Sequence, residues 1–322
     1  MTIKNWPASV RGRLSNISRA TGRPFAELLQ YYAMERFLYR LGESEHRGSF
    51  ILKGALIFRA WGAPLERSTK DIDLLGYTNN AVENLVTIVQ EVCAQDVSPD
   101  GMIFDPELVK GQRIKEGAEY EGVRVRFLGK LGRARIHMQI DVGFADVVTP
   151  EPITVDYPTI LEMPAPQLRG YPRETVVAEK VHAMVVLGTL NSRMKDFYDL
   201  WQLAQHFNFE GSTLQDAIVQ TFRRRNTIVQ KDLPVALSEQ FAHDKQSQWQ
   251  VFSQNTTFEL GSQDFVQIIH DCRAFLFPLL QACAMNQRFD KIWQAGGDGW
   301  THTPESAFGA DLSGFESQAS QD

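Results

Sequence analysis

Two aspartates separated by one residue, Asp71 and Asp73, form the pattern in this sequence that most clearly suggests chemistry. They alternate with Ile72 and Leu74, as in a half-buried strand that carries both carboxylates on one face. Two carboxylates about 7 Å apart along a strand can turn toward one hard cation. Mg²⁺ suits such a pair, because it binds one or two protein carboxylates and completes its shell with water and phosphate oxygens. The alternative interpretation is an ordinary acidic turn on the surface.

A lysine–glycine turn comes before this pair in the chain. Residues 49–52 predict a strand that stops at Lys53 and Gly54, and the apolar residues that follow predict a short helix. Glycine lets the backbone come close to a ligand, and the first amides of a helix attract phosphate. Such turns are common, so this one is a weak indication by itself. A polar turn that contains Arg67, Ser68 and Thr69 separates it from the aspartates.

A third carboxylate, Asp141, lies near the end of a predicted long strand. Residues 134–142 alternate between aliphatic and polar side chains, and residues 123–127 alternate between apolar residues and arginine. With a turn near residues 129–132, they predict an antiparallel hairpin. Its basic residues are Arg124, Arg126, Lys130, Arg133 and Arg135. Asp141 is placed to face a cleft, and the alternative is a strand aspartate that faces solvent.

Two later helices hold the remaining candidates. Residues 150–172 contain six prolines and predict an extended connector, after which a helix begins. Lys180 lies at the edge of the apolar stripe of that helix, where a lysine either reaches for water or meets a phosphate. The next helix carries Lys195, Asp196 and Asp199 near its start. The helix dipole offers a purely structural explanation for acidic residues there.

The composition indicates a globular protein with a sizeable core. The chain has 322 residues, of which 43% are hydrophobic and 22% are charged. No apolar run approaches the ~18 residues that span a bilayer, and the first residues lack the apolar segment of a secretory signal. The three cysteines are widely spaced and form no zinc motif. A reducing cytoplasm is therefore the expected location, without a membrane partner.

The charge is unevenly distributed. The net charge is −6, but residues 292–322 hold five acids and no lysine or arginine, which leaves −1 for the rest. Basic patches such as the hairpin and residues 223–225 can bind phosphate in a protein that is acidic as a whole. Their usual meaning is a solvated face. RNA therefore stays open as a partner.

The remaining sequence predicts further elements and no additional chemistry. A packing helix is expected from about residue 24 to 41 and another over 80–98, followed by a loop-rich stretch at 99–106. Helical segments are expected near 213–225, 233–252 and 262–286. Residues 294–322 are rich in glycine, serine and polar residues and predict a disordered tail.

Five segments, in this order, resemble the AbiEii/AbiGii toxin family of nucleotidyltransferases, which belongs to the polymerase-β-like superfamily. They are KGALIFRAW, RSTKDIDL, QIDVGFAD, AEKVHAM and RMKDFYDLWQL, within about residues 25–205. The resemblance implies an α+β fold in which helices flank a small mixed sheet and a helical region follows. We expect a nucleotidyltransferase core with N-terminal helices at 1–160, a helical domain at 161–293 and the tail at 294–322.

The resemblance also implies roles for the candidate residues. Asp71 and Asp73 become the metal-binding pair, with Asp141 as a third metal-binding carboxylate, and Lys180 and Asp196 become further catalytic residues. The implied nucleotide-binding residues are Lys53, Gly54, Arg67, Ser68, Thr69, Lys195 and Asp199. The chain departs from the family at Ala55, where relatives often have glycine or serine. Phosphate binding would then rely on backbone amides and Lys53.

The implied reaction is transfer of a nucleoside monophosphate from an NTP to RNA, with a tRNA 3′ end as the favoured acceptor and with Mg²⁺ or Mn²⁺. A cognate antitoxin protein is the expected partner. Two alternatives stay open: transfer to a protein or a small molecule, and a catalytically inactive binding module.

Overall fold

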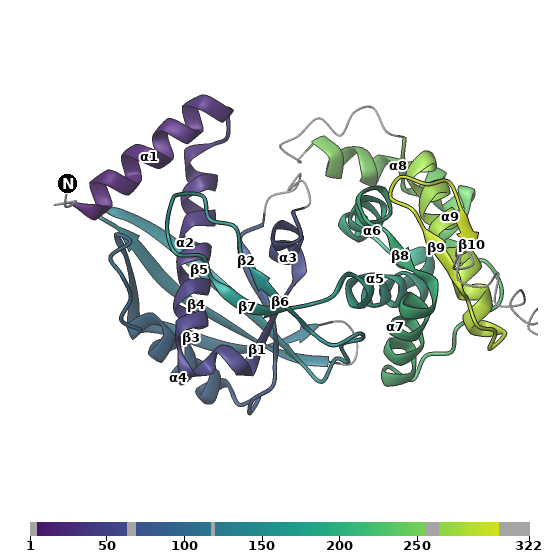
Figure 1. The fold of residues 1–322 in the computed structure, drawn as a ribbon, viewed down its shortest axis with the longest axis horizontal. Coiled ribbons are helices and arrows are strands. Elements are labelled where there is room, and N and C mark those ends of the chain that lie inside the picture. The colour runs from purple at the N-terminus through teal and green to yellow at the C-terminus, as the bar shows by residue number, and fades with distance from the viewer. Residues whose placement is uncertain (1–4, 63–68, 117–119, 255–263, 303–322) are drawn as a thin grey trace, which may run out of the picture.

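A seven-stranded mixed sheet forms the first part of the computed structural model, which describes residues 5–62, 69–116, 120–254 and 264–302 (Figure 1). The strand order is β3-β4-β5-β2-β1-β7-β6. The strands are β1 (Phe50–Lys53), β2 (Asp71–Gly76), β3 (Met102–Glu116), β4 (Tyr120–Leu131), β5 (Ala134–Phe144), β6 (Ile153–Asp156) and β7 (Gln167–Gly170).

Strand β2 lies near the middle of this sheet, between β1 and β5. It runs antiparallel to β1 and parallel to β5, and the register places Asp73 opposite both Lys53 and Asp141. Strand β1 also pairs in parallel with β7. Residues that are far apart in the sequence therefore meet at one end of adjacent strands.

Two long helices cover one face of the sheet. They are α2 (Phe25–Glu43) and α4 (Val82–Ala94), and α1 (Trp6–Thr21) packs on α2 (Figure 1). The ring of Phe37 on α2 lies 5.7 Å from that of Phe104 and 4.9 Å from that of Phe127, between ring centroids. This face is therefore the apolar core of the sheet, as the alternation of residues 123–127 and 134–142 predicts.

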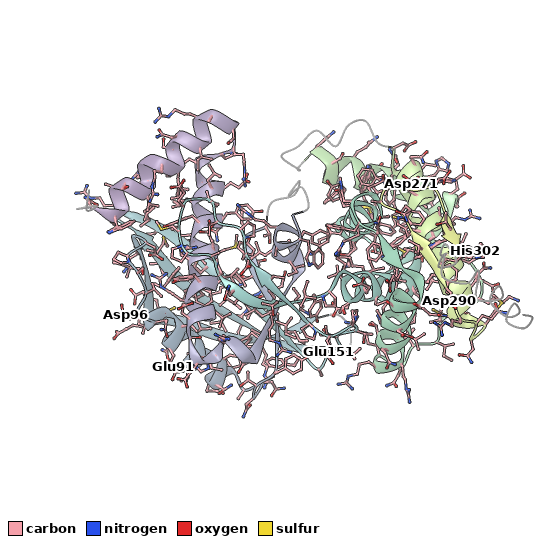
Figure 2. The ribbon with its side chains drawn as sticks, viewed as in Figure 1. Glu91, Asp96, Glu151, Asp271, Asp290 and His302 are labelled. Carbon is pink, nitrogen blue, oxygen red and sulfur yellow. The ribbon has the colours of Figure 1, made fainter. Side chains whose placement is uncertain are left out.

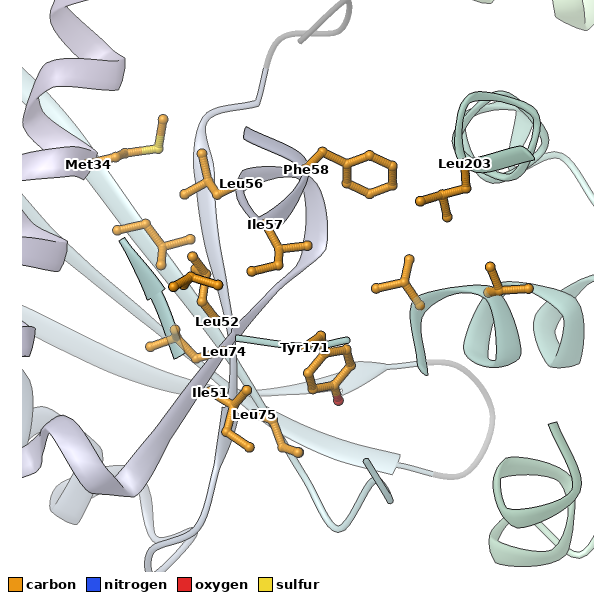
Figure 3. Packing of buried hydrophobic residues seen from close by; sticks show 14 of the residues in the cluster. Met34, Ile51, Leu52, Leu56, Ile57, Phe58, Leu74, Leu75, Tyr171 and Leu203 are labelled. Atoms are coloured by element: carbon orange, nitrogen blue, oxygen red, sulfur yellow. The ribbon is translucent and has the colours of Figure 1, made fainter. Parts of the chain in front are cut away.

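A short helix, α3 (Gly54–Ala60), begins directly after β1 and connects the sheet to the second part of the molecule. Leu56 and Ile57 are fully buried. Phe58 points from α3 toward Leu203 on α6 (Figure 3), and the ring of Trp61, directly after α3, lies 6.2 Å from that of Phe207, directly after α6, between centroids. Apolar packing thus holds the two parts together around α3.

The second part of the chain is mainly helical. Its helices are α5 (Arg173–Leu187), α6 (Met194–His206), α7 (Gly211–Arg224), α8 (Glu239–Gln254) and α9 (Phe265–Ala284). Single 3₁₀ turns occur at Glu45–Ser49, Gly188–Leu190 and Val235–Leu237. A small sheet with the order β10-β9-β8 covers α9, and its strands are β8 (Phe209–Glu210), β9 (Lys291–Trp293) and β10 (Trp300–His302). Among the described helices, none is both long and apolar enough to cross a membrane.

The α+β fold with a mixed sheet between helices is confirmed, but several expected loops are strands. The stretch expected as a loop at 99–106 contains the start of β3. Pro106 obscures this strand in the sequence, yet it fits because β3 is an edge strand and its register shifts between Asp105 and Lys110. The connector at 150–172 contains β6 and β7, so the division expected at residue 160 falls inside the sheet.

Part of the stretch expected as a disordered tail at 294–322 is ordered. Residues 300–302 form β10, and Trp300 stacks on Phe275 with the ring centroids 5.7 Å apart. The indole Nε1 of Trp300 donates a hydrogen bond of 2.8 Å to the carbonyl oxygen of Phe275. The contacts of Trp300 therefore order residues 300–302, although most residues around them in the sequence are polar. Residues 303–322 lie outside the described residues.

Candidate active site

A cavity of about 910 Å³ lies where the sheet faces helices α5 and α6. It is lined by strand residues, by helix residues and by the segment after α7. Of the residues expected to act in chemistry or nucleotide binding, those that line it are Lys53, Gly54, Thr69, Asp71, Asp73, Asp141, Lys180, Lys195 and Asp196. Asp199 contacts Lys180 directly. Arg67 and Ser68 lie outside the described residues.

The two aspartates of β2 share one face, as their spacing predicts. Ile72 and Leu74 are buried on the other face, whereas Asp71 and Asp73 are partly exposed to the cavity. The β2–β5 register brings Asp141 beside Asp73 on the same face. Three carboxylates from two adjacent strands thus border one cavity.

Gly54 is required by its position against Asp73. It has a φ of +68°, which L side chains rarely adopt, and an added Cβ would lie 1.9 Å from Oδ2 of Asp73. Any side chain at residue 54 would therefore displace this carboxylate. The sequence predicts that Gly54 allows close approach of a ligand, and in the structure the group that approaches it closely is Asp73.

Asp141 is held by an arginine from the neighbouring strand. Its oxygens accept hydrogen bonds of 2.7 Å each from Nε and Nη2 of Arg124. This fork-to-fork geometry is strong and directional. The structure thus gives Arg124 a place in the site, although the sequence indicates it only as part of a basic hairpin.

The electrostatics of this group favour a bound cation. Burial raises the pKa of the Asp71 carboxyl, and the negative charge of Asp141 raises it further, whereas Arg124 and Lys195 oppose the change. A cation beside Asp71 would remove the cost of holding this carboxylate ionised. Carboxylate oxygens are the ligands that Mg²⁺ prefers. Asp71 and Asp73 therefore fit the implied metal.

Asp141 fits less directly as a third ligand. Both of its oxygens are bound to Arg124. In the described part of the chain, the carboxylate oxygens of Asp71, Asp73 and Asp141 do not all lie within 4.8 Å of one another. The described group that does meet this distance, Glu45, His46 and Glu91, lies outside the cavity, with Glu91 on the outer side of α4 (Figure 2). A metal-binding role of Asp141 stays a prediction.

Lys180 forms the centre of a second ion-pair group. Its Nζ donates hydrogen bonds of 2.8 Å to Oδ1 of Asp196 and of 2.8 Å to Oδ2 of Asp199. Arg193 pairs with the other oxygen of Asp196 at 2.5 Å. The side chains of Asp196 and Asp199 are only 3% and 4% exposed, so these carboxylates fix the position of Lys180. Asp199, four residues after Lys195 on α6, thus binds a lysine of the preceding helix.

A third group connects the sheet to the segment after α7. Asp146 accepts a hydrogen bond of 2.8 Å from Nη2 of Arg225 and one of 3.4 Å from Nζ of Lys53. Burial would raise the pKa of Asp146, but the charges of Lys53 and Arg225 lower it overall. His182 lies beside Arg225, and burial, together with that charge, lowers the pKa of His182 to about 4. His182 is therefore neutral at pH 7.

Sequence reasoning misses Asp146 and Arg225 as candidates. Asp146 is the last residue of the segment QIDVGFAD, and Arg225 ends a basic run that is typical of a solvated face. Their pairing depends on a contact across 79 residues of sequence. The spacing of either residue alone gives no signal for it.

The site thus combines carboxylates on the sheet with cations around them. Lys53, Lys180, Lys195 and Arg225 all border the same cavity as Asp71 and Asp73. Carboxylates that can hold a divalent ion, next to fixed cations, suit a polyphosphate substrate.

A family model agrees with this chemistry. The model of the family described as "Nucleotidyl transferase AbiEii toxin, Type IV TA system" matches residues 36–276. No curated protein sequence matches the chain. Among solved structures, one from H. pylori, provisionally assigned as a nucleotidyltransferase, is 16% identical, with a TM-score of 0.44, and the match covers 81% of this chain and 95% of the other. JHP933 from Helicobacter pylori is 14% identical, with a TM-score of 0.42 and coverage of 81% and 92%.

Proposed function

We propose a substrate and a mechanism from the premise that this chain belongs to the AbiEii nucleotidyl transferase toxin family and is a nucleotidyltransferase. We propose that it transfers a nucleoside monophosphate from an NTP to an RNA, specifically to a tRNA 3′ end. The observation that carries the proposal is the meeting of Asp71 and Asp73 with Lys53, Lys180 and Lys195 around one cavity.

Asp71 and Asp73 would hold Mg²⁺ or Mn²⁺. When bound, the ion neutralises phosphate charge and orients the triphosphate. The close fit of Asp73 against Gly54 supports this assignment, because that carboxylate is held in place by the backbone of the β1–α3 turn.

The lysines would bind the triphosphate. Asp196 and Asp199 hold Lys180 at the border of the cavity, where its ammonium group can stabilise charge that develops on the leaving pyrophosphate. Lys53 and the first amides of α3 lie next to Asp73 and also border the cavity. Two sources of positive charge, one on the sheet and one on α5, would thus orient the phosphates.

The chemical step exchanges one phosphorus–oxygen bond for another. The acceptor hydroxyl oxygen attacks the α-phosphorus, the bond to the bridging oxygen of the β-phosphate breaks, and pyrophosphate leaves with the electron pair. The proton of the acceptor hydroxyl must pass to a base, and we expect the nearby Asp141 carboxylate to act as that base. Arg124 would keep Asp141 oriented for this role.

RNA is favoured as the acceptor because the exposed strands next to the aspartates are basic. Arg126 and Arg135 lie on the hairpin that also carries Arg124. Membership of a type IV toxin–antitoxin family also implies a cognate antitoxin as partner. We expect the enzyme to act in the cytoplasm, where tRNA and NTPs occur together.

Labelled nucleotides provide the direct test. Purified protein is incubated with Mg²⁺, total tRNA and each α-³²P-labelled NTP in turn, beside Asp73→Asn and a matched control, Asp290→Asn. Asp290 lies at the far end of the molecule and pairs with Arg288 on the surface (Figure 2). We expect RNA labelling by the wild type and the control only. Label on protein alone, or none with any NTP, would contradict the RNA proposal.

A further inference from the structure

The outer face of the β3–β4–β5 part of the sheet carries a basic surface that continues from the active site. Residues paired across adjacent strands point to the same face. The register places Gln139 beside Asp71, Arg126 beside Gln139, and Lys110 beside Arg126. A row of polar side chains therefore runs from the first catalytic aspartate to the edge strand β3.

This face is the one opposite to the apolar core. The buried residues Phe104, Val125 and Phe127 lie on the other side, against α2 and α4. Lys110, Gln112, Arg126, Arg135 and His137 are all exposed. The part of the sheet next to the cavity thus presents an open polar surface among the described residues.

Three cations on this surface have no acidic partner among the described residues. Arg124 and Lys130 are neutralised by Asp141 and Asp105. In contrast, Arg126 donates a hydrogen bond to the neutral side chain of Gln139, and within the described part of the chain no ion pair involves Lys110, Arg126 or Arg135. Lys110, Arg126 and Arg135 therefore carry positive charge outside any ion pair among the described residues, and we call them the sheet-face cations.

The dimensions of the surface fit a short stretch of polynucleotide. Three steps of about 4.8 Å across the strands place Lys110 on the order of 14 Å from Asp71, and four residues along β5 place Arg135 on the order of 13 Å from Gln139. Phosphate contacts fix the position of a nucleic acid without reading its sequence. A surface with this charge and extent suits the phosphates nearest to a reacting 3′ end.

We propose that the acceptor RNA crosses the outer face of β3–β4–β5, with the sheet-face cations bound to its phosphates and its 3′ hydroxyl at Asp71 and Asp73. This inference rests on the proposed RNA acceptor and adds the route by which the RNA enters. The nucleotide would then occupy the opposite side of the cavity, near Lys180 and Lys53.

The test uses Lys110→Gln combined with Arg135→Gln. Arg126 is left unchanged, because its charge lowers the pKa of Asp71. The matched control is Arg47→Gln with Arg273→Gln, two exposed cations on the 3₁₀ turn before β1 and on α9. Two readouts are used: binding of a fluorescent eight-nucleotide RNA to the Asp73→Asn background over a range of salt, and transfer to that RNA and to a trinucleotide.

For a single strand, removal of two phosphate contacts makes the negative slope of log affinity against log salt less steep by about 1.4. This change corresponds to on the order of 25-fold weaker binding at 0.1 M salt. We expect that loss with the eight-nucleotide RNA, together with a raised KM, and a much smaller change with the trinucleotide. The control pair should bind as the wild type does.

Two negative outcomes have different meanings. If the wild type labels RNA but the double variant keeps the same salt slope and KM, the sheet face is not the RNA path, although the proposed reaction stands. If the wild type neither labels nor binds RNA, and an acidic protein partner binds the same face instead, both proposals are wrong.

Discussion

At the scale of single residues, the active site depends on positions that few other residue types could fill. Gly54 adopts a left-handed backbone conformation directly against Asp73. Asp71 is held partly buried beside Asp141. Burial of the Asp71 carboxylate favours binding of a cation over stability of the empty protein, which is common at functional sites.

The Gly54→Ala variant should lose transfer activity and some stability. The new Cβ would lie 1.9 Å from Oδ2 of Asp73, so the carboxylate must move, and the backbone strain costs about 1–3 kcal/mol. Activity and the urea midpoint would be compared with Gly48→Ala, whose added Cβ meets no atom within 4 Å. Full activity in Gly54→Ala would show that the position of Asp73 is unimportant.

The Asp71→Asn variant should be more stable than the wild type at neutral pH without metal. The folded pKa of Asp71 is raised above its unfolded value, so the ionised carboxylate destabilises the folded state once the pH exceeds that raised pKa. The advantage of the amide should be complete at a pH above that raised pKa and disappear as the pH falls below the unfolded pKa of about 3.9. Thermal melts in EDTA across this range measure it. An advantage that persists at low pH would have another cause.

At the scale of secondary-structure elements, helices α5 and α6 meet through one lysine. Lys180 on α5 neutralises Asp196 and Asp199 on α6, and all three lie near the cavity. The pair of helices therefore serves two purposes, since the same contact joins the elements and positions a cation for catalysis.

The Lys180→Met variant should separate these two purposes. Loss of the lysine removes the ion pairs of two buried carboxylates, Asp196 and Asp199. This loss should lower the free energy of unfolding by about 3 kcal/mol or more. A triple variant that adds Asp196→Asn and Asp199→Asn should recover most of that stability but remain inactive. Urea denaturation and the transfer assay give the two readouts. Recovery of activity in the triple variant would mean that Lys180 acts only in structure.

At the scale of the whole molecule, the cavity has one wall on the sheet and one on the helical part. The two parts are also joined by α3 and, at the border of the cavity, by the pair of Asp146 and Arg225. A ligand that contacts both walls would stabilise the complete fold, and not only one part.

Mg²⁺ with a non-hydrolysable NTP should therefore raise the melting temperature of the protein. Saturation at about 100 times the dissociation constant adds about 2.7 kcal/mol to the free energy of unfolding. EDTA should remove most of the effect, and Asp73→Asn should show little of it, whereas Asp290→Asn should behave as the wild type. Equal stabilisation of Asp73→Asn would place the nucleotide away from β2.

Much of the candidate site could be predicted from the sequence because its parts are local. Alternation places Asp71 and Asp73 on one face, and the glycine between a strand and a helix indicates the turn at Gly54. Such patterns need only the geometry of a single strand or turn. The same reasoning predicts α2, α5 and α6, whose apolar periodicity is regular.

The tertiary structure alone determined how these parts are paired. The register that brings Lys53, Asp73 and Asp141 side by side depends on the order of non-adjacent strands. Strand β3 forms despite its proline because it pairs with β4 on both sides of a register shift, and β10 forms because Trp300 bonds to Phe275, which is 25 residues earlier in the chain. The sequence by itself determined which residues can do chemistry, whereas long-range pairing and packing, which no local pattern encodes, decided which residues they meet.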